Sequence, residues 1–491
     1  MKRILFFAFV FASASAIAQT EGSAFTQTGH AASLTFATDY QCVGINPANL
    51  GWKRKYPEKK ATFGLGEIGY SLTTTAFDRA GLKDQFFPSL MGSADDFTYK
   101  EKVAAAANFN GASIGANIDV MAFGFSYQTD SAGGFAFTIS DHISWFSEFN
   151  KNTADIMFLG YNAPYFEYLA LDLTGDGIAD DTIANGAGVT DAQREQVVSG
   201  GTYNGQHAQK LINGSTYDFL WYRSYGLSWG GRVGHGESVD WFVGAGVKYI
   251  QGFGMIDIHS DGGDYLAQSS LSPGFKIDYG ENASKNPSHR SGDSMEPVGK
   301  GIGIDIGLSA IVQEKWKIGL AYLDLGSIKW DGNVFVAADS TVSTLDEDGF
   351  DNSNFFDQAD NFASDRGIYE WVGVSEVKTK LPGTLRTGVG YVASEKTELG
   401  IETVLPMSDE AGSMRKAAIN MGGSYRPAEW LSLNLGIGIG GNYPTRMPFG
   451  ITLGTKDGTW EAGFGQRDIR SLFGGGDPTV GMCFGILRFR V

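Results

Sequence analysis

The residues best suited to chemistry lie in a short acidic segment in the first half of the chain. Its oxygen-bearing side chains are Asp172, Thr174, Asp176 and Asp180. Hard cations such as Ca²⁺ prefer oxygen donors at this alternate spacing, held by a tight glycine turn. An EF-hand would also need a glutamate at position 183, where the chain has Ile183. The segment therefore predicts a shorter structural calcium loop, with a solvated acidic turn as the alternative. A second acidic segment, 346–352, has similar chemistry.

Catalytic motifs are weak in this sequence. The stretch Gly226–Gly230 reads G-L-S-W-G, as the nucleophile elbow of a hydrolase does. That elbow requires a turn from a strand into a helix, whereas 226–230 lies inside a predicted strand. The six histidines show no metal-ligand spacing such as His-x-x-x-His. We therefore expect neither an enzyme nor a catalytic metal.

The elements that position these residues are β-strands. In 431–440 every second residue is leucine or isoleucine, and the residues between them are glycine, serine or asparagine. A helix would need apolar residues three and four apart. The same alternation predicts an all-β protein with about 14 antiparallel strands. These are 61–75, 112–128, 134–147, 217–232, 238–253, 301–312, 315–328, 384–394, 397–405, 415–426, 430–440, 447–455, 459–466 and 480–491.

The connections between these strands alternate in length. After every even-numbered strand the connection is short, as in 129–133 and 233–237. After odd-numbered strands it is mostly long, and the longest connections are 76–111, 148–216, 254–300 and 329–383. Short periplasmic turns opposite long outer loops are typical of an outer-membrane β-barrel, here 61–491, with both termini in the periplasm. A soluble sandwich has no reason to sort its loops in this way.

Charged residues on the small-residue face of the strands should point into the lumen. They are Asp305, Arg386, Glu398, Glu402 and Glu461. They either line a permeation path or form ion pairs that hold a plug. Tryptophans near the strand ends are expected to form aromatic girdles in the outer membrane lipid. They are Trp145, Trp229, Trp241, Trp316, Trp430 and Trp460.

Residues 1–18 have the pattern of a signal peptide, with Lys2 and Arg3, an apolar run and a small-residue cleavage site. No later stretch has the ~20 apolar residues of a transmembrane helix. The formal net charge of −17 argues against nucleic acid as a partner. Cys42 and Cys483 are the only cysteines, and either a bridge between them or two buried thiols fits an exported protein.

Residues 19–60 do not alternate, and their apolar side chains need burial, which favours a hatch or plug inside the barrel. Within them, 39–50 (D-Y-Q-C-V-G-I-N-P-A-N-L) resembles the N-P-A-x-L hatch motif of the long-chain fatty-acid transporter family. That superfamily also includes toluene and xylene channels and the accessory barrel of the type IX secretion machinery. Residues 381–391 resemble its L-P-x-x-x-x-x-G-V-x-Y strand entry, and 427–431 its short periplasmic turn.

This resemblance, closest to an uncharacterised branch of the superfamily, implies a 14-stranded barrel closed by an N-terminal hatch. The hatch positions would be Asn46, Pro47, Asn49 and Leu50. Two features depart from the family: the outer loops are larger and more acidic, and the chain ends in Val491 rather than an aromatic residue.

The function that follows is passive uptake of a hydrophobic or amphipathic small molecule through the outer membrane. The alternative is a barrel scaffold that does not transport and whose outer loops bind a surface or secretion protein.

Overall fold

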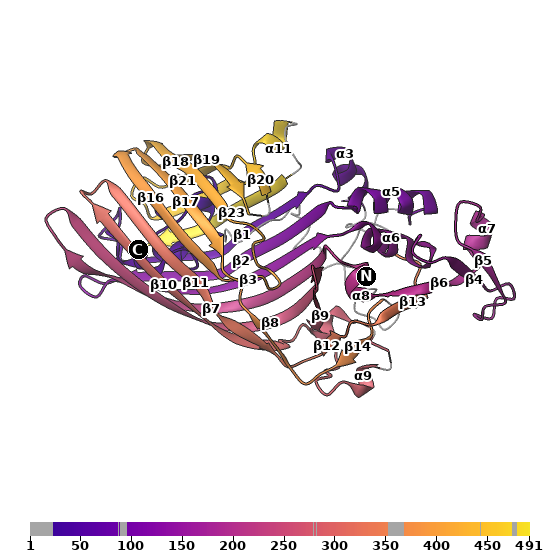
Figure 1. Cartoon of the computed structure of the whole chain (residues 1–491). Coiled ribbons are helices and arrows are strands. Elements are labelled where there is room, and N and C mark those ends of the chain that lie inside the picture. Colours follow the sequence, from indigo (N-terminus) through magenta and orange to yellow (C-terminus); the bar gives the residue numbers. More distant parts are fainter. Residues whose placement is uncertain are drawn as a thin grey trace.

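Fourteen antiparallel strands form a closed barrel in the computed structural model (Figure 1). The structure describes residues 23–86, 88, 96–277, 279–280, 282–351, 368–441, 443–473 and 479–491, so the predicted signal peptide 1–18 lies outside the described residues. The barrel strands are β1 (Ala61–Thr74), β2 (Ser113–Gln128), β3 (Gly134–Glu148), β7 (Ser215–His235), β8 (Val239–Asp261), β10 (Gly299–Val312), β11 (Trp316–Trp330), β16 (Thr384–Ser394), β17 (Thr397–Pro406), β18 (Ala418–Ala428), β19 (Leu431–Gly440), β21 (Phe449–Gly454), β22 (Trp460–Gln466) and β23 (Thr479–Arg490). Closure comes from β1, in which Ser71 lies opposite both Asn117 of β2 and Gly481 of β23. The predicted strand number is confirmed.

Three predicted strands end elsewhere than expected. The strands predicted at 217–232 and 238–253 are longer, because β7 and β8 continue as a ribbon beyond the barrel, where β8 pairs with β9 (Asp264–Leu271). The strand predicted at 447–455 is shorter, and β20 (Tyr443–Arg446) precedes it and pairs with β19. Alternation in the sequence does not mark where these strands end. A strand that continues past the barrel still has one buried face, so its alternation continues too.

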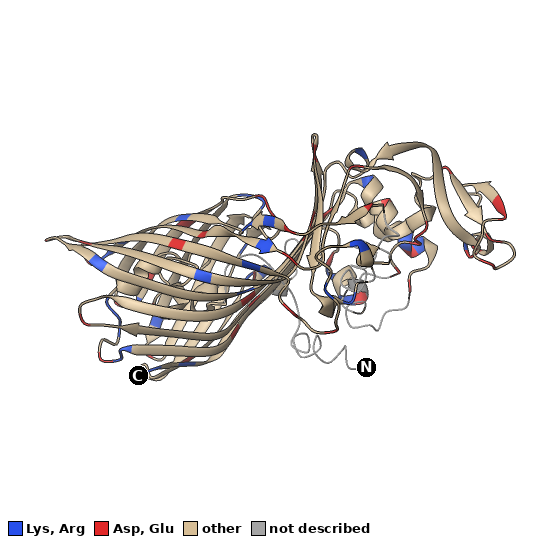
Figure 2. Cartoon of the chain, turned by 90° about the horizontal axis from the view of Figure 1, so that it is seen from below, with Lys and Arg blue, Asp and Glu red and all other residues tan. Residues whose placement is uncertain are grey.

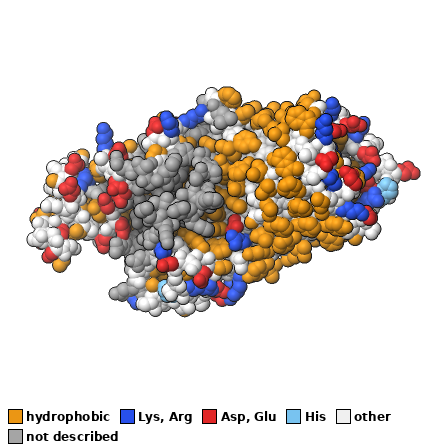
Figure 3. Space-filling model, turned by 180° about the vertical axis from the view of Figure 1, so that it is seen from behind, with side chains coloured by type: hydrophobic (Ala, Val, Ile, Leu, Met, Phe, Trp, Pro, Cys, Tyr) orange, Lys and Arg blue, Asp and Glu red, His pale blue; other side chains and the backbone are white. Residues whose placement is uncertain are grey.

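The strands follow the predicted alternation between an apolar outer face and a small or polar inner face. In β10, Ile302, Ile304 and Ile306 are 60, 45 and 49% exposed, whereas Asp305 between them is fully buried. Successive side chains of a strand point to opposite faces, so the isoleucines face outward and Asp305 faces the lumen. Figure 3 shows the resulting broad apolar band over the barrel, with charged side chains gathered at its far end.

The long connections fold together into an outer region at one end of the barrel (Figure 2). A second sheet there has the order β13-β6-β4-β5, and its strands are β4 (Tyr168–Leu171), β5 (Asp181–Ala184), β6 (Val197–His207) and β13 (Thr341–Leu345). Helices α5 (Tyr99–Phe109) and α6 (Lys151–Leu159) share an aromatic core, with the Phe109 and Phe158 rings 5.0 Å apart. Thr98 and Glu101 form a capping box that begins α5. The C-terminus lies at the opposite end, beside the short turns.

Further short elements connect these parts. The helices are α2 (Phe25–Thr28), η1 (Asp39–Cys42), η2 (Pro47–Gly51), α3 (Arg79–Gly81), η3 (Leu82–Phe86), η4 (Gly160–Asn162), α7 (Asp191–Arg194), α8 (Ala208–Leu211), η5 (Pro273–Phe275), α9 (Asn282–Lys285) and α11 (Arg470–Phe473), and the strands are β12 (Val334–Ala337), β14 (Trp371–Gly373) and β15 (Val377–Lys380). In the described part of the chain, no helix is both long and apolar enough to cross a membrane.

The six tryptophans predicted for the girdles differ in exposure, and Trp229 and Trp460 are half-buried. Trp241, Trp316 and Trp430 are 57, 45 and 46% exposed at the turn end of their strands. Trp145 is only 3% exposed and packs into the core of the outer region. Its assignment to a girdle was wrong, because the outer loops fold over the end of β3.

Candidate functional site

Residues 24–52, here called the N-terminal segment, lie against the inner face of the barrel. Trp52 Nε1 donates a hydrogen bond to Ser309 Oγ on β10 at 2.9 Å. On the opposite wall, His30 Nε2 lies 2.9 Å from Asn434 Oδ1 on β19. This stretch therefore contacts strands on both sides of the barrel, and most of its residues are buried.

The residues predicted for the hatch form one turn of this segment. Asn46 precedes the short helix η2, and its side-chain oxygen accepts a hydrogen bond from the Ala48 N–H at 3.1 Å, with Pro47 in the first helical position. The Asn46 side chain also donates to the Leu308 carbonyl of β10 at 3.1 Å. Asn49 donates to the carbonyls of Leu34 and Ala37, both at 2.9 Å, so it fastens this turn to the preceding one.

Glycines on the strands allow this turn to approach the wall closely. A Cβ on Gly244 or Gly307 would overlap atoms of residues 46–48. A Cβ on Gly422 would overlap the carbonyl oxygen of His30. The inward glycines noted in the sequence therefore make room for the N-terminal segment rather than for open space.

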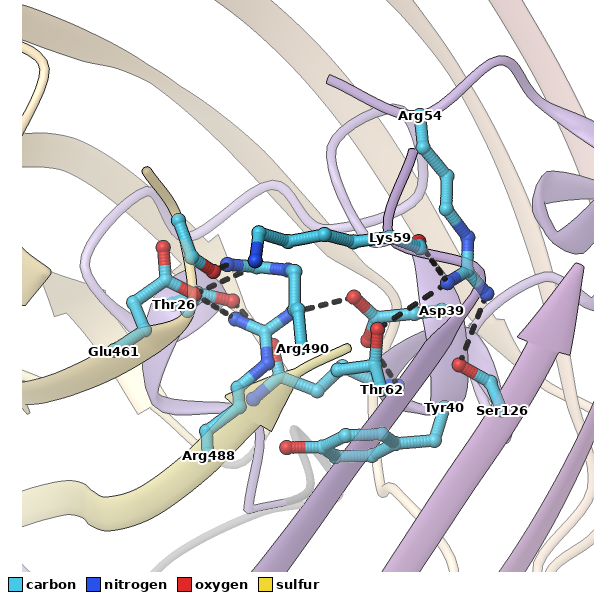
Figure 4. Close-up of polar contacts among 12 residues, drawn as sticks. Thr26, Asp39, Tyr40, Arg54, Lys59, Thr62, Ser126, Glu461, Arg488 and Arg490 are labelled. Atoms are coloured by element: carbon cyan, nitrogen blue, oxygen red, sulfur yellow. Dashed lines mark hydrogen bonds and ion pairs between the residues drawn. The ribbon is translucent and has the colours of Figure 1, made fainter. Parts of the chain in front are cut away.

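Ion pairs fasten the segment beside the seam of the barrel (Figure 4). Arg488 of β23 donates from Nη2 to Asp39 Oδ2 at 2.6 Å and from Nη1 to Glu461 of β22. Arg490 also reaches Glu461, at 2.7 Å. The guanidinium of Arg488 is buried, so removing Asp39 would leave a buried charge with less compensation.

The other charged residues predicted to face the lumen are also paired. Arg386 and Glu402 lie 3.0 Å apart and are almost fully buried. Glu402 accepts the backbone N–H of Ser33 at 2.6 Å, so this pair holds the N-terminal segment too. Asp305 pairs with Lys248 at 3.0 Å and Glu398 with Lys317 at 3.0 Å.

An apolar layer lies in the lumen on the outer side of the N-terminal segment. Its buried side chains include Leu220, Tyr222, Ile250, Met255, Ile328 and Trp330. Ala411, from the connection between β17 and β18, packs into the same layer. Since β17 and β18 are not neighbours of β7, this connection reaches across the mouth of the barrel.

A polar chain crosses three neighbouring strands, and sequence reasoning missed it. His142 Nδ1 on β3 lies 2.7 Å from Asp119 Oδ1 on β2, and His142 Nε2 lies 3.3 Å from Ser224 Oγ on β7. Tyr222 stacks on the His142 ring, with centroids 4.8 Å apart. The short turn between β2 and β3 sets the register that places Asp119 opposite His142, so this pair could have been predicted from the sequence. Nothing in the sequence indicated that Ser224 joins it.

The predicted calcium loop lies on the surface of the outer region. The Asp172 carboxylate accepts backbone N–H groups from Gly175 at 2.5 Å and from Gly177 at 2.7 Å. Asp180 accepts from Thr174 N at 3.0 Å. These hydrogen bonds lower the pKa of Asp172, chiefly the one from Gly177. Calcium binding by Asp172, Thr174, Asp176 and Asp180 stays a prediction.

The second acidic segment has a cation from the protein itself. Lys102 of α5 lies 3.1 Å from a carboxylate oxygen of both Asp348 and Asp351. Position 352, the end of the predicted segment, lies outside the described residues. Within the described part, 346–351 therefore anchors α5.

The structure locates the two cysteines and the G-L-S-W-G stretch noted in the sequence. Cys42 and Cys483 are both free and buried, and Cys483 Sγ donates to the Ser23 carbonyl at 2.9 Å. The G-L-S-W-G stretch, Gly226–Gly230, lies within β7 as expected and makes no strand-to-helix turn.

The family model of DUF5723, described as a family of unknown function, matches residues 195–457. The chain belongs to this family. The expectation of an uncharacterised branch is thereby confirmed, and the matched range of this DUF5723 protein extends from the second sheet through β21. No curated protein matches the chain.

Solved structures similar to this DUF5723 protein include two toluene transporters and a FadL homologue. The toluene transporter TbuX of Ralstonia pickettii is 12% identical, with 96% of this chain and 97% of that chain covered and a TM-score of 0.40. The toluene transporter TodX of P. putida is 11% identical, with 96 and 97% covered and a TM-score of 0.40. A FadL homologue of Pseudomonas aeruginosa is 10% identical, with 97 and 99% covered and a TM-score of 0.38. With sequence identities and TM-scores this low, neither the substrate nor the mechanism of these transporters can be assigned to this chain.

Proposed function

We propose that this protein is an outer-membrane channel for the passive uptake of hydrophobic or amphipathic small molecules. The observation that supports it best is the apolar layer of Leu220, Tyr222, Ile250, Met255, Ile328 and Trp330 in the lumen. An apolar ligand is held mainly by apolar side chains with few polar groups, and this layer is where the lumen offers such side chains.

The outer face of the barrel supports a membrane location. Lipid offers no hydrogen bonds, so a spanning sheet must close on itself and turn apolar side chains outward. The β1–β23 pairing closes this sheet, and residues such as Ile302 and Ile439, 60 and 57% exposed, face outward. The exposed tryptophans at the turn end fit the headgroup level, which agrees with periplasmic turns and both termini on that side.

The N-terminal segment acts as the hatch in this proposal. It lies between the apolar layer and the turn end of the barrel, so a solute from outside would meet the apolar layer first. Asn46, Pro47, Asn49 and Leu50 are almost fully buried, and η2 is held by hydrogen bonds rather than by a covalent link. Such a segment can shift without unfolding the barrel, because the strand ladder does not depend on it.

Ligand retention tests this function. The protein is purified in mild detergent, and small molecules that co-purify are extracted and identified by mass spectrometry. Wild-type protein should carry an enriched apolar species. Ile250→Asn, inside the apolar layer, should lose it, whereas Tyr203→Ala, on the second sheet, should keep it. An equal yield from wild-type protein and Ile250→Asn would contradict the proposal.

One observation favours the alternative, a scaffold that binds a surface or secretion protein. Tyr203 on the second sheet is 77% exposed, and its ring lies 4.9 Å from that of Tyr168. Exposed aromatic residues are common at the centre of protein interfaces. Cross-linking on whole cells that captures one specific protein with wild-type protein, but not with Tyr203→Ala, would support this function instead.

A further inference from the structure

Three polar side chains meet on the inner wall at the mouth of the barrel. Asp218 of β7 and Asp257 of β8 lie directly opposite each other in the strand register. His259 follows Asp257 by two positions in β8, so it points to the same face. One oxygen of each carboxylate and one ring nitrogen of His259 all lie within 4.8 Å of one another, and among the described residues this is the only group of its kind.

Both carboxylates are buried with half of their hydrogen-bonding capacity unused. Asp218 and Asp257 are 2 and 1% exposed. Asp257 Oδ1 lies 2.8 Å from His259 Nδ1, and Asp218 Oδ2 pairs with Arg415. Asp257 Oδ2 and Asp218 Oδ1 are buried and have no hydrogen-bond partner in the described structure. Two carboxylates placed opposite each other repel, so these buried, unpaired oxygens need a positive ligand.

Neighbouring residues increase the negative charge at this place. The connection between β17 and β18, residues 407–417, contributes Glu410, which lies in this outer part rather than in the membrane. Burial raises the pKa of Glu410, and the charge of Asp257 raises it further. Arg415 of the same connection supplies one positive charge to Asp218. Lys380 lies 4.0 Å from Glu410, and a dication would neutralise the negative charge that these two cations leave.

The donor set selects the class of ion. Calcium and magnesium prefer oxygen ligands throughout, whereas an imidazole nitrogen with two carboxylates suits zinc and other divalent first-row metals. A histidine ring fixed by a carboxylate is the usual support for a metal-bound histidine. We infer that Asp218, Asp257 and His259 bind a divalent metal ion of the zinc class on the inner wall of the barrel mouth, with a fourth position open to water.

Such an ion would link two parts of the mouth. Gly412 of the connection 407–417 lies against Leu220 and Ser144 on the inner wall, and Arg415 binds Asp218, one of the ligands. The metal would hold β7 and β8 in the geometry that receives this connection. The inference does not depend on transport, since a scaffold with the same mouth would bind the same ion.

Metal titration of the full chain tests the site. Protein in detergent is stripped with a chelator, dialysed and titrated with Co²⁺, with visible absorption as the readout, and Zn²⁺ content is then measured by elemental mass spectrometry. Wild-type protein should bind about one equivalent, with absorption bands of a nitrogen- and oxygen-ligated ion. Asp257→Asn and His259→Gln should each weaken binding about 10-fold or more.

The control is a second histidine–aspartate pair in the same protein. His235 Nδ1 lies 2.6 Å from Asp240 Oδ1 near the turn end, where His235 is exposed. His235→Gln should leave Co²⁺ binding unchanged. Wild-type protein that binds no more metal than His259→Gln would overturn the inference, as would equal losses in His235→Gln and His259→Gln. Heat-modifiable migration on gels checks that each barrel is folded. If the variants are not folded, the metal stoichiometry of wild-type protein alone tests the inference.

Discussion

Lowering the pH from 7.5 to 5 should loosen the N-terminal segment through one residue, His30. This histidine lies outside the strands, is 3% exposed, and donates from Nε2 to Asn434 Oδ1. Its Nδ1 is buried and has no hydrogen-bond partner among the described residues. A second proton would have to sit on that nitrogen. Burial therefore lowers the pKa of His30 from 6.5 to about 4.

The sign and size of the effect follow from this shift. The pKa of His30 is lower in the bound segment than in a released one, so the neutral form stabilises binding above pH 6.5. That stabilisation is lost as the pH falls from 6.5 toward 4, and the full loss is about 3 kcal/mol. At pH 5 the released fraction should be about 30-fold higher than at pH 7.5.

Cys42 reports this release because it is buried in the same segment. Cys483→Ser removes the second thiol and keeps a donor for the Ser23 carbonyl. Cys42 is labelled with 2,2′-dithiodipyridine, which also reacts in acid. The rate of labelling is divided by the rate for glutathione at the same pH. The normalised rate should rise about 30-fold from pH 7.5 to 5 when reclosing is faster than labelling, and His30→Gln should abolish the rise. An equal rise in wild-type protein and His30→Gln would refute the reasoning.

Three further changes test the fit of the segment and the outer loops. Gly422→Ala, whose methyl would overlap the N-terminal segment, should speed Cys42 labelling at pH 7.5 by about 10-fold or more. Gly115→Ala is the control and should leave the rate unchanged, because its methyl would lie 3.4 Å from the nearest atom, on Thr73. Arg386→Met should lower the free energy of unfolding in urea by about 3 kcal/mol, because Glu402 stays buried without its cation, and adding Glu402→Gln should restore about half; a fully stable single variant would contradict this. Chelator should increase protease cleavage of 148–216, and unchanged cleavage would end the calcium hypothesis.

The alternation in the sequence predicted the strands and their number, and the loop lengths then favoured a barrel over a sandwich. Side chains of a strand alternate between its faces because of backbone geometry, so 431–440 reports its two environments without any distant contact. Short connections alternating with long ones also predicted that the turns gather at one end of the barrel. The prediction failed where alternation continues past the barrel, at the outer ends of β7 and β8.

The sequence predicted which strand residues face the lumen but not which residues they contact there. The sequence indicated that Arg386 and Glu402 face inward, and their hairpin makes them neighbours across two adjacent strands. It could not indicate that Ser33 completes this site. Contacts of that sort depend on where a non-repeating segment lies inside the closed barrel, and no period in the sequence encodes that.

The sequence by itself therefore determined the class of fold, the strand number and the inward or outward direction of most strand residues, because these follow from the local geometry of a strand. Only the tertiary structure decided which inward residues meet. Asp39 and Arg488 are 449 positions apart, and Asp218, Asp257 and His259 come together through the register of a long hairpin. Closing the barrel brings such residues within a few ångströms, and the energy of those contacts, rather than any local pattern, fixes what the lumen holds.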